Sequence, residues 1–193
     1  MPDLSLSSAL CHPRRQMQHF AAQPPTLATL PLATWAGLVG IAVGGSVIYG
    51  ASLSLRFPGW RPDSGALWLA LSAGLGWCVF GPALVLVTQR NPLACAHACL
   101  VTMAYGEAVL LSGAVANLLH PLLNWLYPLD PLHLNLATVS LSNVVMAAAL
   151  ALQLRELGVP ATTTLLLWMG ALNGSGALFF WLFHRLLHQE VHL

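Results

Sequence analysis

The segment FWLFHRLLHQEVHL, residues 180–193, carries three histidines at intervals of four residues. Side chains four residues apart lie on one face of an α-helix, so His184, His188 and His192 share a face wherever the helix continues. Two imidazoles at this spacing can bind one metal ion. The pattern therefore indicates part of a site for a divalent metal such as zinc or copper, which imidazole suits.

Further ligands must come from another part of the chain, because a protein metal site needs at least three of them. His120 and His133 flank a predicted connection between two helices, and Asp130 lies within it. In a five-helix arrangement this connection and the end of the last helix are on the same side of the membrane. We expect these residues to complete the site. The alternative is that the histidines are polar residues at the membrane boundary, with Arg185 extending to water beside them.

The same stretch resembles the first histidine box, HRxxH preceded by aromatic residues, of the fatty acid hydroxylase and sterol desaturase family. The residues that match are Trp181, His184, Arg185, Leu187 and His188. The resemblance implies a membrane enzyme with a di-iron centre. Because the sequence has no later HxxHH-type box, it implies only a fragment of such an enzyme, inactive alone.

A second set of chemically capable residues lies inside the apolar part of the chain. Glu107 is near the centre of one predicted helix, Asn143 and Asn173 are near the centres of the next two, and Tyr105 is close to Glu107. A carboxyl group in lipid costs a few kcal/mol, so Glu107 must face other helices. We expect it within reach of Asn143 or Asn173. These residues form either a structural clamp of interhelical hydrogen bonds or a site that relays protons or binds a small polar solute.

The motif CAHAC, residues 95–99, has the ligand types of a metal site but the wrong spacing. On a helix Cys95 and Cys99 share a face, whereas His97 points away from it. The sequence therefore predicts two packing cysteines and a histidine at the membrane boundary. The four cysteines do not form the pattern of a secreted disulfide framework.

The elements that must position these residues are long apolar helices. Hydrophobic residues make up 57% of the 193 residues and charged residues only 7%, against about 25% in soluble domains. A helix needs about 20 apolar residues to cross a bilayer. We predict an all-α integral membrane bundle of about five such helices, at about 32–55, 65–89, 93–119, 134–154 and 162–188.

The predicted bundle, residues 31–193, is a single transmembrane domain, preceded by a flexible or interfacial tail, residues 1–30. Basic residues favour the cytoplasmic side of a membrane. Helix alternation puts Arg14, Arg15, Arg90 and Arg155 on one side, and Arg56, Arg61 and Arg185 on the other. This distribution favours an N-terminus inside and a C-terminus outside. We predict a multi-pass protein of the bacterial inner membrane.

Small residues at intervals of four indicate how helices approach one another in lipid. Ala36, Gly40 and Gly44 form one such stripe in the first predicted span, and Gly170 and Gly174 form another in the last. They predict either close packing within the bundle or a homo- or hetero-oligomer through these faces. The net charge of +1 implies no nucleic-acid partner.

These observations predict a small, non-catalytic membrane protein. It is either a subunit of a membrane complex or a protein that transports a small solute or ion by way of its mid-membrane polar residues. The alternative is the fragment of a histidine-box hydroxylase or desaturase, with a divalent metal as its cofactor.

Overall fold

The computed structural model describes residues 4–29, 32–56, 65–126 and 130–189, and in these ranges the chain is all-α, without strands. Two short helices, α1 (Leu6–Cys11) and α2 (Pro13–Ala22), and the 3₁₀ turn η1 (Leu27–Thr29) come first. Four long helices follow: α3 (Leu32–Arg56), α4 (Gly65–Thr88), α5 (Pro92–Leu126) and α6 (Pro131–Glu156). The last part consists of α7 (Ala161–Leu167), the π-helix η2 (Trp168–Gly174) and α8 (Ser175–Gln189) in direct succession.

Four segments of the described helices are long and apolar enough to cross a membrane: Leu32–Leu53, Pro92–Leu122, His133–Glu156 and Ala161–Leu182. A helix suits this environment because it satisfies its backbone hydrogen bonds internally. The remaining predicted span corresponds to α4, whose segment Gly74–Thr88 is apolar but shorter than the other four. The all-α class is therefore confirmed, and a count of five spans stays a prediction.

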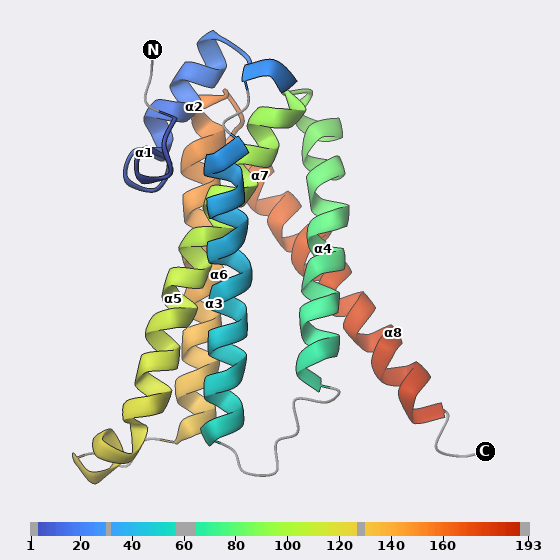
Figure 1. The fold of residues 1–193 in the computed structure, drawn as a ribbon. Coiled ribbons are helices and arrows are strands. Elements are labelled where there is room, and N and C mark those ends of the chain that lie inside the picture. Colours follow the sequence, from blue (N-terminus) through green and yellow to red (C-terminus); the bar gives the residue numbers. More distant parts are fainter. Residues whose placement is uncertain (1–3, 30–31, 57–64, 127–129, 190–193) are drawn as a thin grey trace.

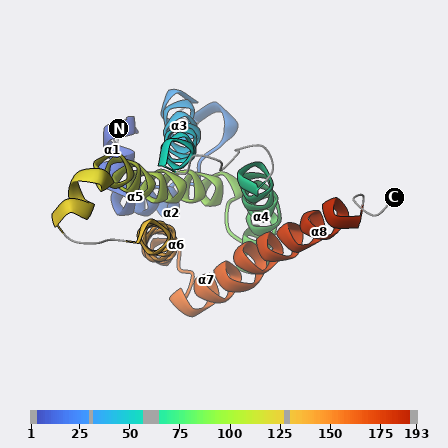
Figure 2. The ribbon, with the colours of Figure 1, turned by 90° about the horizontal axis from the view of Figure 1, so that it is seen from below.

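Helix α5 is the centre of the bundle. It packs against α3 on one side and against α6 on the other, and α3 and α5 run in the same direction (Figure 1, Figure 2). Helix α4 packs mainly against η2 and α8. Figure 2 shows α8 passing α4 and running away from α5 and α6. The end of α8 is therefore the part of the bundle farthest from its centre.

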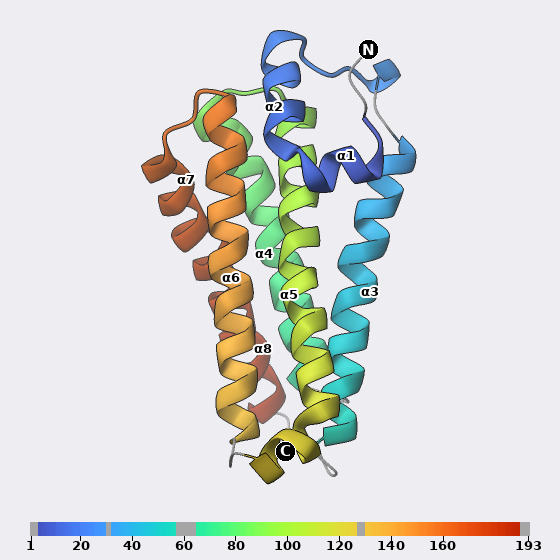
Figure 3. The same ribbon diagram turned by 90° about the vertical axis from the view of Figure 1, so that its left-hand side faces the viewer.

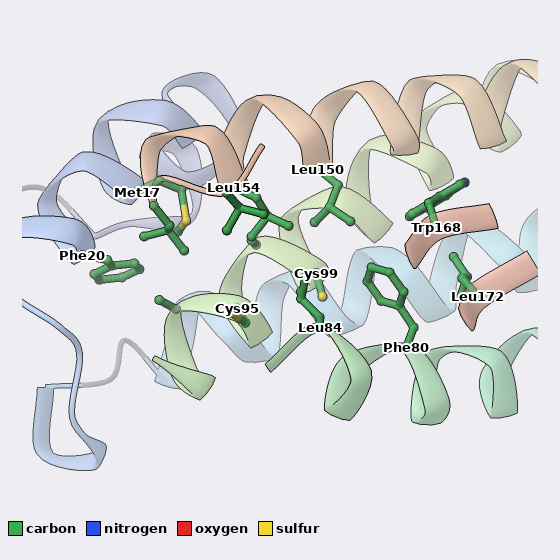
Figure 4. Close-up of a cluster of buried hydrophobic side chains, with 14 residues drawn as sticks. Met17, Phe20, Phe80, Leu84, Cys95, Cys99, Leu150, Leu154, Trp168 and Leu172 are labelled. Carbon is green, nitrogen blue, oxygen red and sulfur yellow. The ribbon is translucent and has the colours of Figure 1, made fainter. Parts of the chain in front are cut away.

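The main core is formed by side chains from α2, α4, α5, α6 and η2 (Figure 4). Phe80 and Trp168 pack edge to face with their ring centroids 5.9 Å apart, which is a favourable aromatic geometry. Leu150 and Leu154 of α6 are completely buried beside them. Cys95 and Cys99 are buried in the same core as free thiols, which confirms their predicted role as packing residues.

The start of the chain is folded onto one end of the bundle. Figure 3 shows α1 and α2 lying across α5 at the end where α5 begins. Ala9 of α1 and Met17 of α2 have no exposed surface, and Phe20 is 3% exposed. The sequence predicts a flexible or interfacial tail here. The structure shows two helices with buried side chains because the pattern Gln16, Met17 and Phe20 gives α2 one inward face.

The ends of α6 and α5 show how glycine and proline act at the ends of these helices. Helix α6 ends at Glu156, and Gly158 then adopts a φ of +77°, a conformation that favours glycine. Its amide donates to the carbonyl of Arg155, which ends α6 close to the predicted end of the fourth span at about residue 154. By contrast, α5 does not end near residue 119, the predicted end of the third span, because it continues through Pro121 to Leu126. A proline removes only one backbone hydrogen bond, and membrane helices tolerate this loss.

The glycines at which helices pack closely in the structure are not those of the two predicted small-residue stripes. In α5, a Cβ atom at Gly106 would clash with Met146, and one at Gly113 would clash with Thr138. These two positions allow α6 to pack closely on α5. By contrast, Gly40 and Gly44 in α3 and Gly170 in η2 have no neighbouring atom within 4 Å of the place where a Cβ would be. Packing within the described part of the bundle therefore does not explain them.

Candidate functional site

Glu107 lies in the contact between α5 and α3. Because these helices run in parallel and Ser46 is almost as far along α3 as Glu107 is along α5, the two residues are at the same depth. The Ser46 hydroxyl donates a hydrogen bond of 2.8 Å to Oε1 of Glu107. A hydroxyl that donates to one carboxylate oxygen stabilises the charged form and fixes the direction of the side chain. Ser46 is thus part of the site and was not predicted.

The neighbouring Gly45 makes room for the carboxyl group. A Cβ atom at this position would be 2.6 Å from Oε2 of Glu107 and 2.7 Å from its Cβ, both closer than real atoms approach. Glycine is therefore required wherever α3 and α5 keep this separation. Gly45 and Ser46 together form a notch in α3 that the Glu107 side chain fills.

The second carboxyl oxygen of Glu107 is the atom of the site that is available to bind a proton or an ion. Oε2 is buried and has no hydrogen-bond partner in the part of the chain that the structure describes. A buried polar atom without a partner costs about 1–3 kcal/mol, and more when the group is charged. Such an atom can accept a proton or a small cation. The arrangement therefore has one oxygen that is held and one that is available.

Asn143 and Asn173 form a separate polar cluster where α6 meets η2. The Asn143 amide donates a 3.0 Å hydrogen bond to Oδ1 of Asn173. The indole of Trp168 donates a 2.7 Å hydrogen bond to Oδ1 of Asn143. The Asn173 amide donates to the backbone carbonyl of Trp168 at 3.1 Å. The cluster therefore connects α6 to the π-helix, a type of element frequently found at functional sites.

Of the four residues predicted near the membrane centre, the structure brings Asn143 and Asn173 together. Glu107 and Tyr105 lie apart from them and from each other's contacts. Glu107 forms its hydrogen bond with α3, and not with Asn143 or Asn173. The cause is the order of packing, because α3 and α6 contact opposite sides of α5. Tyr105 lies elsewhere again, since its hydroxyl donates to the backbone carbonyl of Leu10 in α1.

A third polar cluster joins α3, α5 and α6 further along the bundle. Asn117 donates hydrogen bonds of 3.2 Å to the Ser52 hydroxyl and 3.0 Å to Oδ1 of Asn135. The Tyr49 hydroxyl donates to the same Asn135 oxygen at 2.9 Å. The sequence carries a signal for this cluster, because Asn117 interrupts an apolar run, as Glu107 does. Its amide oxygen is buried and without a partner among the described residues.

His97 is more deeply packed than the sequence indicates. It is 1% exposed and lies beneath α2, and its position at the membrane boundary stays a prediction. The indole of Trp35 donates to Nδ1 at 3.1 Å, so Nδ1 accepts and carries no proton. Nε2 then donates to Oε1 of Gln16 at 2.8 Å. The ring of Phe20 packs edge-on against it, and the imidazole is a neutral connector of α2, α3 and α5.

The predicted metal ligands do not form a cluster in the described part of the chain. No group of three or more histidine, cysteine, aspartate or glutamate residues lies close enough there to hold a metal ion. His120 is 1% exposed inside α5, whereas His133 is exposed and pairs with Asp130 at 3.1 Å. His184 and His188 are within α8, but their side chains lie outside the described part, as does His192.

Comparisons of the chain with models of protein families, with curated proteins and with solved structures give no match. The class of the protein therefore follows from fold and composition. The chain is an all-α protein with four helices of the length and apolarity of membrane spans, and it holds a carboxyl group between two of them.

Proposed function

We propose that the chain is a non-catalytic, multi-pass protein of the bacterial inner membrane that transports a small solute or ion, with Glu107 as its proton- or cation-binding group. The observation that carries this proposal is the asymmetry of the carboxyl group. One oxygen accepts from Ser46, and the other is buried without a partner among the described residues. An ionisable residue within a membrane helix is expensive, which makes such a position a functional candidate.

The chemistry of the proposed site is reversible neutralisation. With a bound proton the carboxyl group is neutral and tolerates the low dielectric between the helices. When the proton leaves, the negative charge remains on the two carboxylate oxygens, and among the described residues only the Ser46 hydroxyl donates a hydrogen bond to them. The charged form therefore favours rebinding of a proton or a small cation. Coupling this cycle to a change in helix packing would move the solute.

Chemical modification tests whether Glu107 takes up a proton. A hydrophobic carbodiimide reacts with protonated carboxyl groups in a membrane and leaves an adduct that mass spectrometry locates. We expect an adduct at Glu107 that forms faster at low pH and is absent from Glu107→Gln. The matched control is Glu156→Gln, because Glu156 is the other described glutamate and is paired with Arg14 at the end of the bundle.

Flux measurements then test transport. The purified protein is placed in liposomes that contain a pH-sensitive dye, and a potassium diffusion potential is applied. We expect proton movement with the wild type and with Glu156→Gln, and none with Glu107→Gln. A folded Glu107→Gln variant that moves protons like the wild type would exclude this role and leave Glu107 as a structural contact.

A second candidate function, subunit of a membrane complex, is favoured by the small-residue stripe on α3. Gly40 and Gly44 are open to the outside of the described bundle, and Ala36 continues the same stripe at the surface. Small residues at such spacing let another helix approach closely. If this face is an interface, Gly40→Leu lowers the oligomer fraction, measured as mass in detergent against the 20.6 kDa of one chain. Gly81→Leu in α4 is the control, because Gly81 is equally open but outside the stripe.

A further inference from the structure

A cavity lies between the two N-terminal helices and the bundle. It has a volume of about 490 Å³, within the range of small-molecule sites. Its walls come from the junction of α1 and α2, from Tyr105 of α5, and from Ala149, Leu152 and Gln153 of α6. Tyr105 also donates a hydrogen bond to the Leu10 carbonyl, which holds α1 against α5 beside the cavity. The position of α1 and α2 on α5 and α6 therefore creates the cavity.

One wall of the cavity attracts anions. Arg14 and Arg15 line it, and both belong to the first turn of α2. Arg14 is paired with Glu156 at 2.6 Å, whereas Arg15 forms no ion pair with any described residue. The helix end itself contributes little, because Pro13 has no amide hydrogen and the Arg15 and Gln16 amides donate to the His12 carbonyl, so the Arg15 side chain is the group that attracts an anion.

On the side of the cavity formed by α6, the Gln153 side chain has an acceptor oxygen that lacks a hydrogen-bond donor among the described residues. Gln153 is 1% exposed, and its amide nitrogen donates to the Thr102 hydroxyl and to the Ala149 carbonyl. Its carbonyl oxygen Oε1 is buried and has no partner among the described residues. A buried oxygen of this kind is stabilised by a ligand that carries a hydroxyl group. Phosphate alone accepts hydrogen bonds and does not meet this need unless it is protonated.

The outer wall is apolar and continues along the bundle. Leu152, which lines the cavity, is 51% exposed. Leu141 lies three helical turns away on the same face of α6 and is 55% exposed. This face offers a surface for an acyl chain that runs along α6 from the cavity. From the cavity outward, Arg15, Gln153 and the leucines of α6 therefore match the anionic group, the hydroxyl group and the acyl chain of a lipid, in that order.

The charge at this end of the bundle agrees with such a ligand. The elements that carry Arg14, Arg15, Arg90 and Arg155 are all at this end (Figure 1), and the described acidic residue there is Glu156. Anionic lipids attract basic groups near the membrane surface with about 1 kcal/mol per residue. We propose that the cavity between α1, α2, α5 and α6 binds the headgroup of an anionic phospholipid, with its phosphate at Arg15 and a headgroup hydroxyl donating to Gln153.

Titration of the purified full-length protein with short-chain lipids tests the proposal. Dioctanoyl phosphatidylglycerol is the anionic probe, dioctanoyl phosphatidylcholine is the zwitterionic control, and inorganic phosphate represents the headgroup chemistry without a lipid. Binding is measured by native mass spectrometry. We expect phosphatidylglycerol to bind the wild type at least fivefold more tightly than phosphatidylcholine does, and inorganic phosphate to compete only weakly.

Two variants localise the binding. Arg15→Gln removes the unpaired cation, and the loss of about 1 kcal/mol corresponds to about fivefold weaker binding of phosphatidylglycerol. The matched control is Arg155→Gln, because Arg155 is exposed at the same end but does not line the cavity. Ala149→Leu fills the cavity and is expected to weaken binding without removing charge. Equal effects of Arg15→Gln and Arg155→Gln would overturn the proposal, and so would inorganic phosphate that binds as tightly as the lipid.

Discussion

The notch formed by Gly45 and Ser46 makes a quantitative prediction for Gly45→Ala. The new Cβ would be 2.6 Å from Oε2 of Glu107 and 2.7 Å from its Cβ. The carboxyl end of Glu107 can rotate, but its Cβ is fixed to α5, so the two helices must move apart. Overpacking of this kind costs about 1–3 kcal/mol. Rotation of the carboxyl group also breaks the bond to Ser46, and interhelical hydrogen bonds in membranes contribute about 0.6 kcal/mol on average.

Alanine also favours a helix more than glycine does, by about 0.5–1 kcal/mol, and this gain must be removed from the comparison. Gly44→Ala provides the reference, because its Cβ meets no atom within 4 Å and it lies in the same helix. Alanine is small enough to preserve the stripe at this position. We therefore expect Gly45→Ala to be less stable than Gly44→Ala by about 2–4 kcal/mol.

The assay is unfolding in detergent, followed by circular dichroism at 222 nm for the two variants and the wild type. For a chain of this size the expected difference corresponds to roughly 5–15 °C in melting temperature. Ser46→Ala separates the two contributions, because it removes only the hydrogen bond to Glu107. Equal melting temperatures for Gly45→Ala and Gly44→Ala would refute the close contact between Gly45 and Glu107.

Three further predictions concern other contacts. In a double-mutant cycle, Asn143→Ala and Asn173→Ala are expected to show a coupling of about 0.6 kcal/mol and at most about 1.7, measured by the same unfolding assay; additive effects would contradict their hydrogen bond. Gly158→Ala is expected to destabilise the protein by about 1–2 kcal/mol, because φ is +77° there; an unchanged melting temperature would contradict that conformation. Glu156→Gln is expected to cost less than about 1 kcal/mol, since its partner Arg14 is 59% exposed, and the difference should disappear in 1 M salt.

The helices themselves were predictable because a chain in lipid must satisfy its backbone groups within each segment. Long apolar runs therefore indicate α3, α4 and α6 with nearly correct bounds, and Gly158 and Pro160 mark the end of α6. The predicted end of the third span was too early, because a single helix-breaking residue does not by itself end a helix. Pro121 has the same residue type as Pro160, yet α5 continues through it.

The partner of Glu107 was not predictable from neighbouring helices in the sequence. The prediction chose Asn143 and Asn173 because they lie near the centres of the next two predicted helices, at the depth expected for Glu107. The structure pairs α5 with α3, a helix two spans earlier, and thereby selects Ser46. The direction of parallel helices and equal depth would have suggested Ser46. Composition and periodicity do not indicate which helices are adjacent, so the choice needed the fold.

The docking of α1 and α2 has a consequence for biosynthesis. Gln18 and Arg14 hydrogen-bond to Glu156, a residue translated 138 and 142 positions later. At about 5–20 residues per second the ribosome needs roughly 7–30 s to reach Glu156 after these residues. Throughout that interval, the inward side chains Met17 and Phe20 lack the α6 surface that buries them in the finished protein. Helices α1 and α2 can therefore complete their docking only after α6 has been synthesised, although they precede it by more than 100 residues.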